Sequence, residues 1–378
     1  MRPTIEGERI GEREVTEKDD RKHKDQGGIR ERGPDLSSSS SSLSSPSSSS
    51  LARVSLPVVE LTNHQHQHQH QYHQHQRYLE RQEDLSPTPP PDMSKLSEAV
   101  KALINIGHAK PGYTRAGAQV KPALEQLAGG AQDKKVGLPA WVTVSTAVSA
   151  TMNCPEAMTQ VFDLANTSNA QSRRTPAQNA ELIREVGLKC ISFNGIPRTI
   201  NTLGAFFRSL PPDVASSLAT TPTRNLTPEN LDIRKKDGLA LWDSVYLGFE
   251  RKLLDKLAQS HPDLPVHIIN GHYSNLLSNP RDAQKQEPVG RVLTSLVAIA
   301  CLRAQTGVGP QVVSHIFGLR KAYEHGDAHA ASEQPVEGGE WLASDDGNLW
   351  LLENVDKLIH AIGGGEGTTF APGIRPKL

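Results

Sequence analysis

Three polar residues of the C-terminal half have the types and spacing to bind and protonate a small organic acid. Arg291 and Ser295 are four positions apart, so they share one helix face, and His315 lies where the next helix begins its contact surface. A guanidinium binds carboxylates and an imidazole titrates near neutral pH, so the three could surround one ligand. The alternative is structural: a solvated helix start, a small packing residue and a satisfied interface histidine.

His272 and Tyr273 form a second pair of candidates, for binding substrate. They directly follow Asn270-Gly271 in the segment that connects the two halves of the chain. A His-Tyr pair at the beginning of a helix also has a purely structural interpretation, which stays open.

The cysteines do not predict thiol chemistry. There are three, Cys154, Cys190 and Cys301, and no Cys-x-x-Cys motif occurs. An odd and sparse set is not a disulfide framework, which favours a reducing compartment. Each lies among apolar neighbours, so we expect small buried hydrophobes.

No metal or other cofactor is expected. Six histidines alternate mainly with glutamine over residues 64–75, but no predicted element would order a ligand geometry there. His325 and His329 lack companion ligands at metal spacing. The glycine-rich segment 363–367 lacks the Lys-Ser/Thr of a phosphate-binding loop.

The charge balance excludes two classes of partner. The 378 residues carry 41 Lys+Arg and 42 Asp+Glu, a net charge of −1. Arg320 and Lys321 alone are too few to neutralise many phosphates, so no nucleic acid is expected. No segment approaches the roughly 18 uninterrupted apolar residues of a membrane-spanning helix, so no membrane partner is expected.

Residues 1–92 are expected to form a long disordered tail, because serine-rich, His/Gln-rich and proline-rich stretches bury too little apolar surface to fold. A translation start at Met93 stays open. The expected location is cytoplasmic. The alternatives are peroxisomal, because Pro376-Lys377-Leu378 approximates the Ser-Lys-Leu address, or mitochondrial if translation starts at Met93.

Beyond Met93 the apolar residues follow the helical period, with prolines at helix starts and glycines at helix ends. The second helix, for example, is expected near Val120–Leu127 and to stop at Gly129-Gly130. This pattern repeats. Segment 310–319 aligns with 155–164, sharing an initial proline and a phenylalanine, and 351–364 aligns with 182–195, sharing a terminating glycine. The second copy has extra residues, which fit the polar stretch 326–346 as a loop. Chance similarity between amphipathic helix pairs is the alternative.

The predicted fold class is therefore all-α, and residues 93–378 form one helical domain. We expect a bundle built from two related helical repeats, at about 139–210 and 291–365, whose apolar faces meet at an internal twofold.

Two segments resemble carboxymuconolactone decarboxylase-like proteins of the AhpD-like alkylhydroperoxidase superfamily, over about half of the chain (139–325). Residues 184–201 resemble the family's helix that ends in Gly-x-Pro and is followed by a helix with an early Asn. Residues 291–315 resemble the helix with an Arg-x-Leu-x-Ser-Leu-like start, followed by a turn and a helix that carries His. The connecting segment resembles decarboxylase-type members at Gly238, Trp242, Tyr246 and Tyr273.

The resemblance implies an all-helical AhpD-like bundle that assembles as a homo-oligomer, usually a trimer or larger ring. Peroxidatic members carry a Glu, a Cys-x-x-Cys and then a His. Counted back from His315, the cysteine positions fall at Val308 and Val312 (or Gln311), and the Glu position falls near Ser295 or Leu296. Dithiol peroxidase chemistry is therefore not expected.

Decarboxylase-like members have no catalytic cysteine and act on a lactone carboxylate. In such a reaction a cation holds the carboxylate, and a proton donor protonates the dienol-type intermediate. The resemblance then makes Arg291, Ser295 and His315 the catalytic candidates and Tyr273 and His272 the substrate-binding ones. We expect a protein that acts on a small organic acid, a lactone or a peroxide-derived compound. The alternative is a non-catalytic oligomeric member that serves as an interaction scaffold.

Overall fold

The computed structural model describes residues 95–167, 174–280 and 287–370. These residues form helices and turns without any strand, which confirms the all-α prediction for the described part of the chain. They belong to one compact unit. Within them, no helix has the length and apolar character needed to cross a bilayer.

Two expectations lie outside the described residues. One is the tail, residues 1–92, with its His/Gln tract, and the other is the terminal tripeptide Pro376-Lys377-Leu378.

The first half of the domain begins its helices at prolines and capping residues, as predicted. Thr175 caps α6 through a capping box with Gln178, and Gly195, at φ 77°, separates α7 from α8. The elements are α2 (Glu98–Ile104), η2 (Gly107–Ala109), α3 (Val120–Asp133), α4 (Leu138–Thr151), α5 (Pro155–Thr167), α6 (Pro176–Lys189), α7 (Ile191–Asn194), α8 (Ile196–Ser209) and α9 (Pro212–Ser217).

The predicted stop of the second helix at Gly129-Gly130 is wrong, because α3 continues to Asp133. Leu127 and Ala131 on either side of the glycines are buried in the core. Burial of this face outweighs the low helix propensity of glycine.

The second half contains a connecting part and then a second group of long helices. Its elements are α10 (Leu231–Tyr246), α11 (Glu250–Ser260), α12 (Asp263–His267), the π-helical η4 (Ile268–Leu277), α13 (Arg291–Gln305), α14 (Gly309–Glu324), η5 (Asp327–His329), α15 (Gly339–Ala343) and α16 (Asp345–Ile362). The prediction of a loop over 326–346 is wrong in part, because η5 and α15 lie in it. Leu342 and Ala343 of α15 are buried, which explains why this polar stretch is partly helical.

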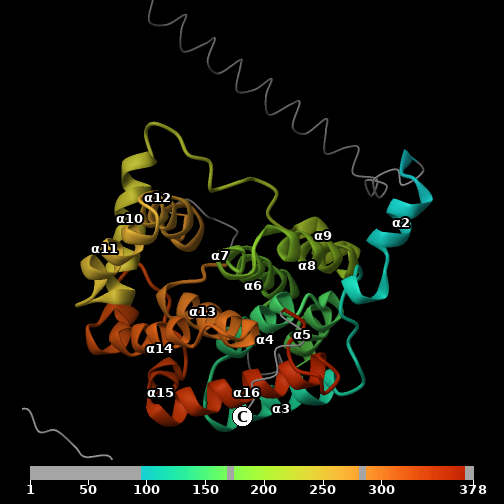
Figure 1. The fold of residues 1–378 in the computed structure, drawn as a ribbon. Helices are drawn as coiled ribbons and strands as arrows, with labels where there is room; N and C mark the ends of the chain where they lie inside the picture. The colour runs from blue at the N-terminus through green and yellow to red at the C-terminus, as the bar shows by residue number, and fades with distance from the viewer. Residues whose placement is uncertain (1–94, 168–173, 281–286, 371–378) are drawn as a thin grey trace, which may run out of the picture. The chain divides into compact units, whose positions relative to one another are not determined.

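Helices α4 and α13 pack against each other at the centre of the domain (Figure 1). Every residue of α4 from Ala140 to Thr151 is buried, and in α13 only Arg303 escapes burial. A helix that is buried on all sides must be surrounded by other helices. Helices α5 and α6 pack on α4, whereas α14 and α16 pack on α13.

The connecting part forms a smaller cluster of its own. Helix α10 packs along η4 and against α14, and Trp242, Tyr273 and Leu277 are its buried apolar residues. Arg291 of α13 donates to Ser244 of α10, so this part of the domain meets the N-terminal turn of α13, which carries Arg291 and Ser295.

Candidate functional site

The first turn of α13 carries the two residues that were predicted to share a helix face. Arg291 Nη1 donates to Ser295 Oγ at 2.6 Å, so the two lie together. Arg291 is only 4% exposed, so the interpretation as a solvated helix start is wrong. Burial lowers the pKa of its guanidinium, and the charges of Asp327, Tyr273 and Glu333 act in the opposite direction.

The guanidinium of Arg291 is already extensively hydrogen-bonded within the protein. Besides its bond to Ser295, Nε donates to Ser244 Oγ at 2.7 Å, and Nη2 donates to the carbonyls of Gly318 at 2.6 Å and Ser244 at 3.3 Å. These bonds join α13 to α10 and α14. Four of the five N–H groups of the guanidinium are thereby engaged. Bidentate hydrogen bonding to a substrate carboxylate would require some of these bonds to break.

His315 of α14 is buried, and its Nδ1 has no hydrogen-bond partner among the described residues. Its ring meets the rings of Phe193 and Tyr246 edge to face, each at 6.0 Å between centroids. Burial, and secondarily the charge of Arg291, lowers the pKa of His315 to about 4. The imidazole is therefore neutral at physiological pH and can accept a proton or a hydrogen bond at one nitrogen.

Tyr246, which meets the ring of His315, is hydrogen-bonded to a second tyrosine. The hydroxyl of Tyr273, on η4, donates to the hydroxyl of Tyr246, on α10, at 3.3 Å, and Trp242 packs against both rings. Burial raises the pKa of Tyr246 and raises that of Tyr273 well above its ordinary value. Both phenols stay protonated and are hydrogen-bond donors at neutral pH.

His272 does not join this cluster in the contacts that the structure describes. Its Nδ1 lies 2.9 Å from Ser192 Oγ, and its ring packs edge to face on His267 at 5.2 Å. Burial lowers the pKa of His272, followed by the effect of His267. The structure therefore separates His272 from Tyr273, which sequence reasoning had paired.

Arg291 also lines a pocket of about 570 Å³ between α10, the end of η4, the start of α13 and the segment after η5. The backbone N–H of Arg291 donates to Glu333 Oε2 at 2.7 Å, and the hydroxyl of Ser244 donates to Asp327 at 2.5 Å. Burial raises the pKa of Glu333. The pocket wall thus combines one buried cation with carboxylates and hydroxyls, which suits a small polar ligand.

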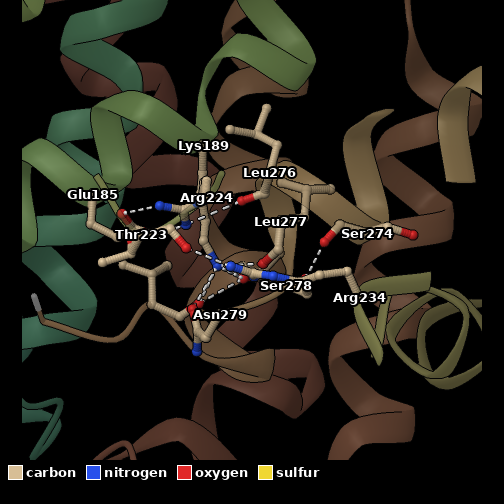
Figure 2. A network of polar contacts seen from close by, with 12 residues as sticks. Glu185, Lys189, Thr223, Arg224, Arg234, Ser274, Leu276, Leu277, Ser278 and Asn279 are labelled. Carbon is tan, nitrogen blue, oxygen red and sulfur yellow. Dashed lines mark hydrogen bonds and ion pairs between the residues drawn. The ribbon is translucent and has the colours of Figure 1, made fainter. Parts of the chain in front are cut away.

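Lys189, at the end of α6, is a buried cation that sequence reasoning missed (Figure 2). Its Nζ donates to the carbonyls of Leu277 and Val289, each at 2.5 Å, to Asn279 Oδ1 at 3.1 Å and to Thr294 Oγ1 at 3.2 Å. All four acceptors belong to residues that line the 570 Å³ pocket. Lys189 therefore holds the two ends of the segment 278–290 together beneath that pocket.

The environment of Lys189 also lowers the pKa of its amine. Burial lowers its pKa to about 7, opposed by Glu185 and assisted by Arg224, which form an ion pair with each other beside it (Figure 2). A lysine in the last turn of a helix usually complements the helix dipole in solvent, so its sequence position gave no sign of burial. Its acceptors are 88 to 105 positions away, which no local pattern reveals.

All three cysteines are buried and free, as expected. Sequence reasoning did not predict that Cys190 Sγ and Cys301 Sγ would lie 3.6 Å apart, because they belong to different halves of the domain. Cys301 Sγ donates a weak hydrogen bond to Cys190 Sγ, and the distance is longer than the 2.05 Å of a disulfide. Burial raises the pKa of Cys154 to about 11, and contact with Cys301 and burial raise that of Cys190, so neither is a thiolate at neutral pH.

Among the described residues, no group of three or more His, Cys, Asp or Glu side chains has an arrangement that could hold a metal ion.

Comparison with known proteins finds a similar sequence in yeast. Peroxisomal protein 2 of Saccharomyces cerevisiae is 30% identical over 155 residues, which cover 36% of this chain and 52% of the yeast protein. The chain thus matches about half the length of that curated relative. No protein-family model and no solved structure matches.

Proposed function

We propose that the chain is an AhpD-like, carboxymuconolactone decarboxylase-like protein that acts on a small organic acid, lactone or peroxide-derived compound by acid-base chemistry. The observation that carries this proposal is the buried, neutral imidazole of His315, whose Nδ1 has no partner among the described residues, beside the protonated phenol of Tyr246 and the charge of Arg291. Buried polar atoms are normally paired, and an unpaired one is typical of a ligand site.

The packing of the helices supports the two-repeat bundle that this proposal assumes. α5 and α6 follow α4 and pack on it, and α14 and α16 follow α13 and pack on it, around a central α4–α13 pair. Two repeats at about 139–210 and 291–365 would place His315 and Arg291 in the second repeat.

Each group then has a distinct role. His315 accepts a proton from the substrate at its unpaired Nδ1, which is unprotonated at neutral pH. A pKa of about 4 makes it a weak base in the empty site, and an anionic substrate bound beside it raises that pKa towards the operating pH. Tyr273 or Tyr246 donates a hydrogen bond to the oxygen on which negative charge develops, and the field of Arg291 stabilises that charge in a dry environment. No thiol takes part, because none of the described cysteines is accessible.

The test is turnover by the purified full chain across a panel of lactones, muconate-type acids and organic hydroperoxides. His315→Ala should reduce kcat by roughly 10²- to 10⁴-fold, the usual contribution of a general base. His325→Ala is the matched control, since His325 is exposed just beyond the same helix and should keep full activity. Absence of turnover and of thermal stabilisation by every compound would remove the enzyme proposal.

The second candidate function is a non-catalytic oligomeric scaffold. The extensive internal bonding of Arg291 favours it, because this cation is already engaged by the protein. Large exposed apolar residues on α8 and α14, such as Ile200 and Phe317, also favour it, because they suit contacts between chains. Light scattering would then give a stable oligomer whose mass His315→Ala leaves unchanged, and turnover of any substrate would refute the scaffold.

We propose a peroxisomal rather than a cytoplasmic location. The name of the yeast relative, Peroxisomal protein 2, supports it, and so does the similarity of Pro376-Lys377-Leu378 to the Ser-Lys-Leu address. A fluorescent protein fused before Met1 should concentrate in peroxisomes and become diffuse when Leu378 is removed. Diffuse or mitochondrial fluorescence of the unaltered chain would contradict the proposal.

A further inference from the structure

A serine hydroxyl and an imidazole lie within hydrogen-bonding distance of each other where α7 contacts η4. Ser192 Oγ is 2.9 Å from His272 Nδ1, although the two residues are 80 positions apart in the chain. A histidine at this distance can remove the proton of a nucleophilic hydroxyl. Neither residue belongs to the cluster around His315, so the pair forms a separate arrangement with chemistry of its own.

The pair is accessible and its imidazole is in the form of a base. Ser192 and His272 are both half-buried, so each side chain also meets solvent, from which a substrate arrives. Burial lowers the pKa of His272, and the nearby His267 lowers it further. The imidazole is therefore neutral at neutral pH. In the tautomer with Nδ1 unprotonated, Ser192 Oγ donates its hydrogen bond to that nitrogen.

The element that carries His272 is itself unusual. η4 is a π-helix of ten residues, and π-helices are rare, short and frequent at functional sites. His267, just before η4, packs edge to face on the ring of His272, with 5.2 Å between centroids. Gly271 makes room for this packing, because a Cβ there would lie 3.2 Å from His267 Cε1. His267 is thus a third group that orients the base.

Hydrogen-bond donors for a developing negative charge follow closely in the chain. Helix α8 begins at Ile196, four residues after Ser192, it contacts α7, and no side chain caps its N-terminus. The N–H groups in the first turn of a helix have no partner within the helix and bind anionic oxygens. The serine therefore lies next to an element that supplies the donors a tetrahedral intermediate needs.

We propose that Ser192 and His272 form a catalytic site of their own, which hydrolyses small esters through an acyl-serine intermediate. As Ser192 Oγ attacks the carbonyl carbon, its proton passes to His272 Nδ1 and then to the leaving oxygen, as the bond between that oxygen and the carbonyl carbon breaks. Water attacks the acyl-serine in the same way, which releases the carboxylic acid and restores both side chains. The third group is a histidine, which stabilises the imidazolium less than a carboxylate would, so esters suit the site better than amides. This activity is independent of any catalytic role of His315.

The experiment mixes the purified full chain with p-nitrophenyl acetate and follows the release of p-nitrophenol. The unaltered chain should give a burst of about one equivalent per chain, and peptide mass spectrometry after acid quenching should locate the acetyl group on Ser192. Ser192→Ala should abolish the burst, and His272→Ala should slow it by about 10²-fold or more. The control is Ser216→Ala, an exposed serine on α9, which should keep the full burst. Unchanged circular dichroism and thermal unfolding establish that the variants fold.

The pH dependence of the burst rate tests the positioning role of His267. His267→Phe keeps a ring beside His272 but removes the charge effect that lowers its pKa, so the rate should fall at a higher pH than in the unaltered chain. His261→Phe, at an exposed position after α11, should leave the profile in place. Acetylation spread over lysines and histidines without a burst overturns the proposal. So does a burst that survives Ser192→Ala, even where His315→Ala removes it, because hydrolysis would then belong to the other site.

Discussion

His315 and Lys189 are both buried titratable groups, yet their surroundings differ. The imidazole has an unpaired Nδ1 and packs between aromatic rings, whereas the amine has four oxygen acceptors. Burial lowers both pKa values, to about 4 for His315 and about 7 for Lys189. Nδ1 of His315 is therefore available to a ligand, whereas Nζ of Lys189 is fully used in hydrogen bonds within the protein.

The pKa of His315 predicts how stability depends on pH. Because it is about 4 in the fold and near 6.5 in the unfolded chain, the unfolded chain holds more protons between these values. The free energy of unfolding should therefore fall by about 1.4 kcal/mol per pH unit from this residue as pH drops from 6.5 towards 4. His315→Phe keeps an aromatic ring but removes the titrating group, so its urea midpoint should differ less between pH 4.5 and pH 6.5 than that of the unaltered chain. The control is His325→Phe, at an exposed position. The same difference in midpoint between the two pH values for both variants would contradict the prediction.

Replacing Lys189 by Met keeps the aliphatic chain but removes three N–H donors. The buried carbonyl of Leu277 then loses this donor, and each unsatisfied buried acceptor costs about 1–3 kcal/mol, so a loss of at least this size is expected in urea unfolding at pH 6.5. The control is Lys121→Met, whose side chain is 73% exposed and which should change stability by less than about 0.5 kcal/mol. A loss no larger than that of the control would refute this structural role for Lys189.

The sequence predicted part of this site and could not predict the rest. The helical spacing of Arg291 and Ser295 and the position of His315 are local, and all three lie at the site. The partners of Lys189 and the contact of Cys190 with Cys301 are not local, because they join segments about a hundred residues apart. Only the fold brings such segments together.

At the scale of elements, α10 and η4 approach each other closely because of one glycine. A Cβ at Gly238 would lie 2.4 Å from the backbone N and Cα of Ser274. Gly238→Ala should therefore push η4 away, lower the free energy of unfolding by about 1–3 kcal/mol and reduce activity if Tyr273 shifts. Gly129→Ala, in α3 with no atom within 4 Å of the new Cβ, should instead stabilise by about 0.4–1 kcal/mol. Chemical denaturation compares the two, and equal effects would contradict the close approach.

Helix beginnings were easier to predict than helix ends. Pro155, Pro176 and Pro310 lie within the first two residues of their helices, because proline needs no hydrogen-bonded N–H there. Gly129-Gly130 did not end α3, because a glycine is only a weak breaker where the flanking apolar residues are buried. The stretch 326–346 reads as polar and therefore as a loop, but tertiary packing of α15 makes part of it helical.

At the scale of the molecule, the main core joins both halves. Buried residues of α4, α5 and α6 form one cluster with those of α13 and α16, so neither half contains a complete core. The periodicity predicted two similar halves, and the twelve consecutive buried residues of α4 show that its surface is covered by both of them.

The continuous core predicts that the first half does not fold alone. A fragment of residues 95–220 retains α2 to α9 but lacks α13 and α16, which cover α4. The exposed face of α4 would be apolar, and the remaining core would be too incomplete to offset the entropy of the chain. The fragment should therefore show reduced helicity by circular dichroism and no cooperative urea transition, whereas the full chain unfolds cooperatively. Adding the fragment 221–370 should restore helicity, because it supplies α13 and α16, which pack on α4. A sharp transition for 95–220 alone would mean that the first half is an independent domain.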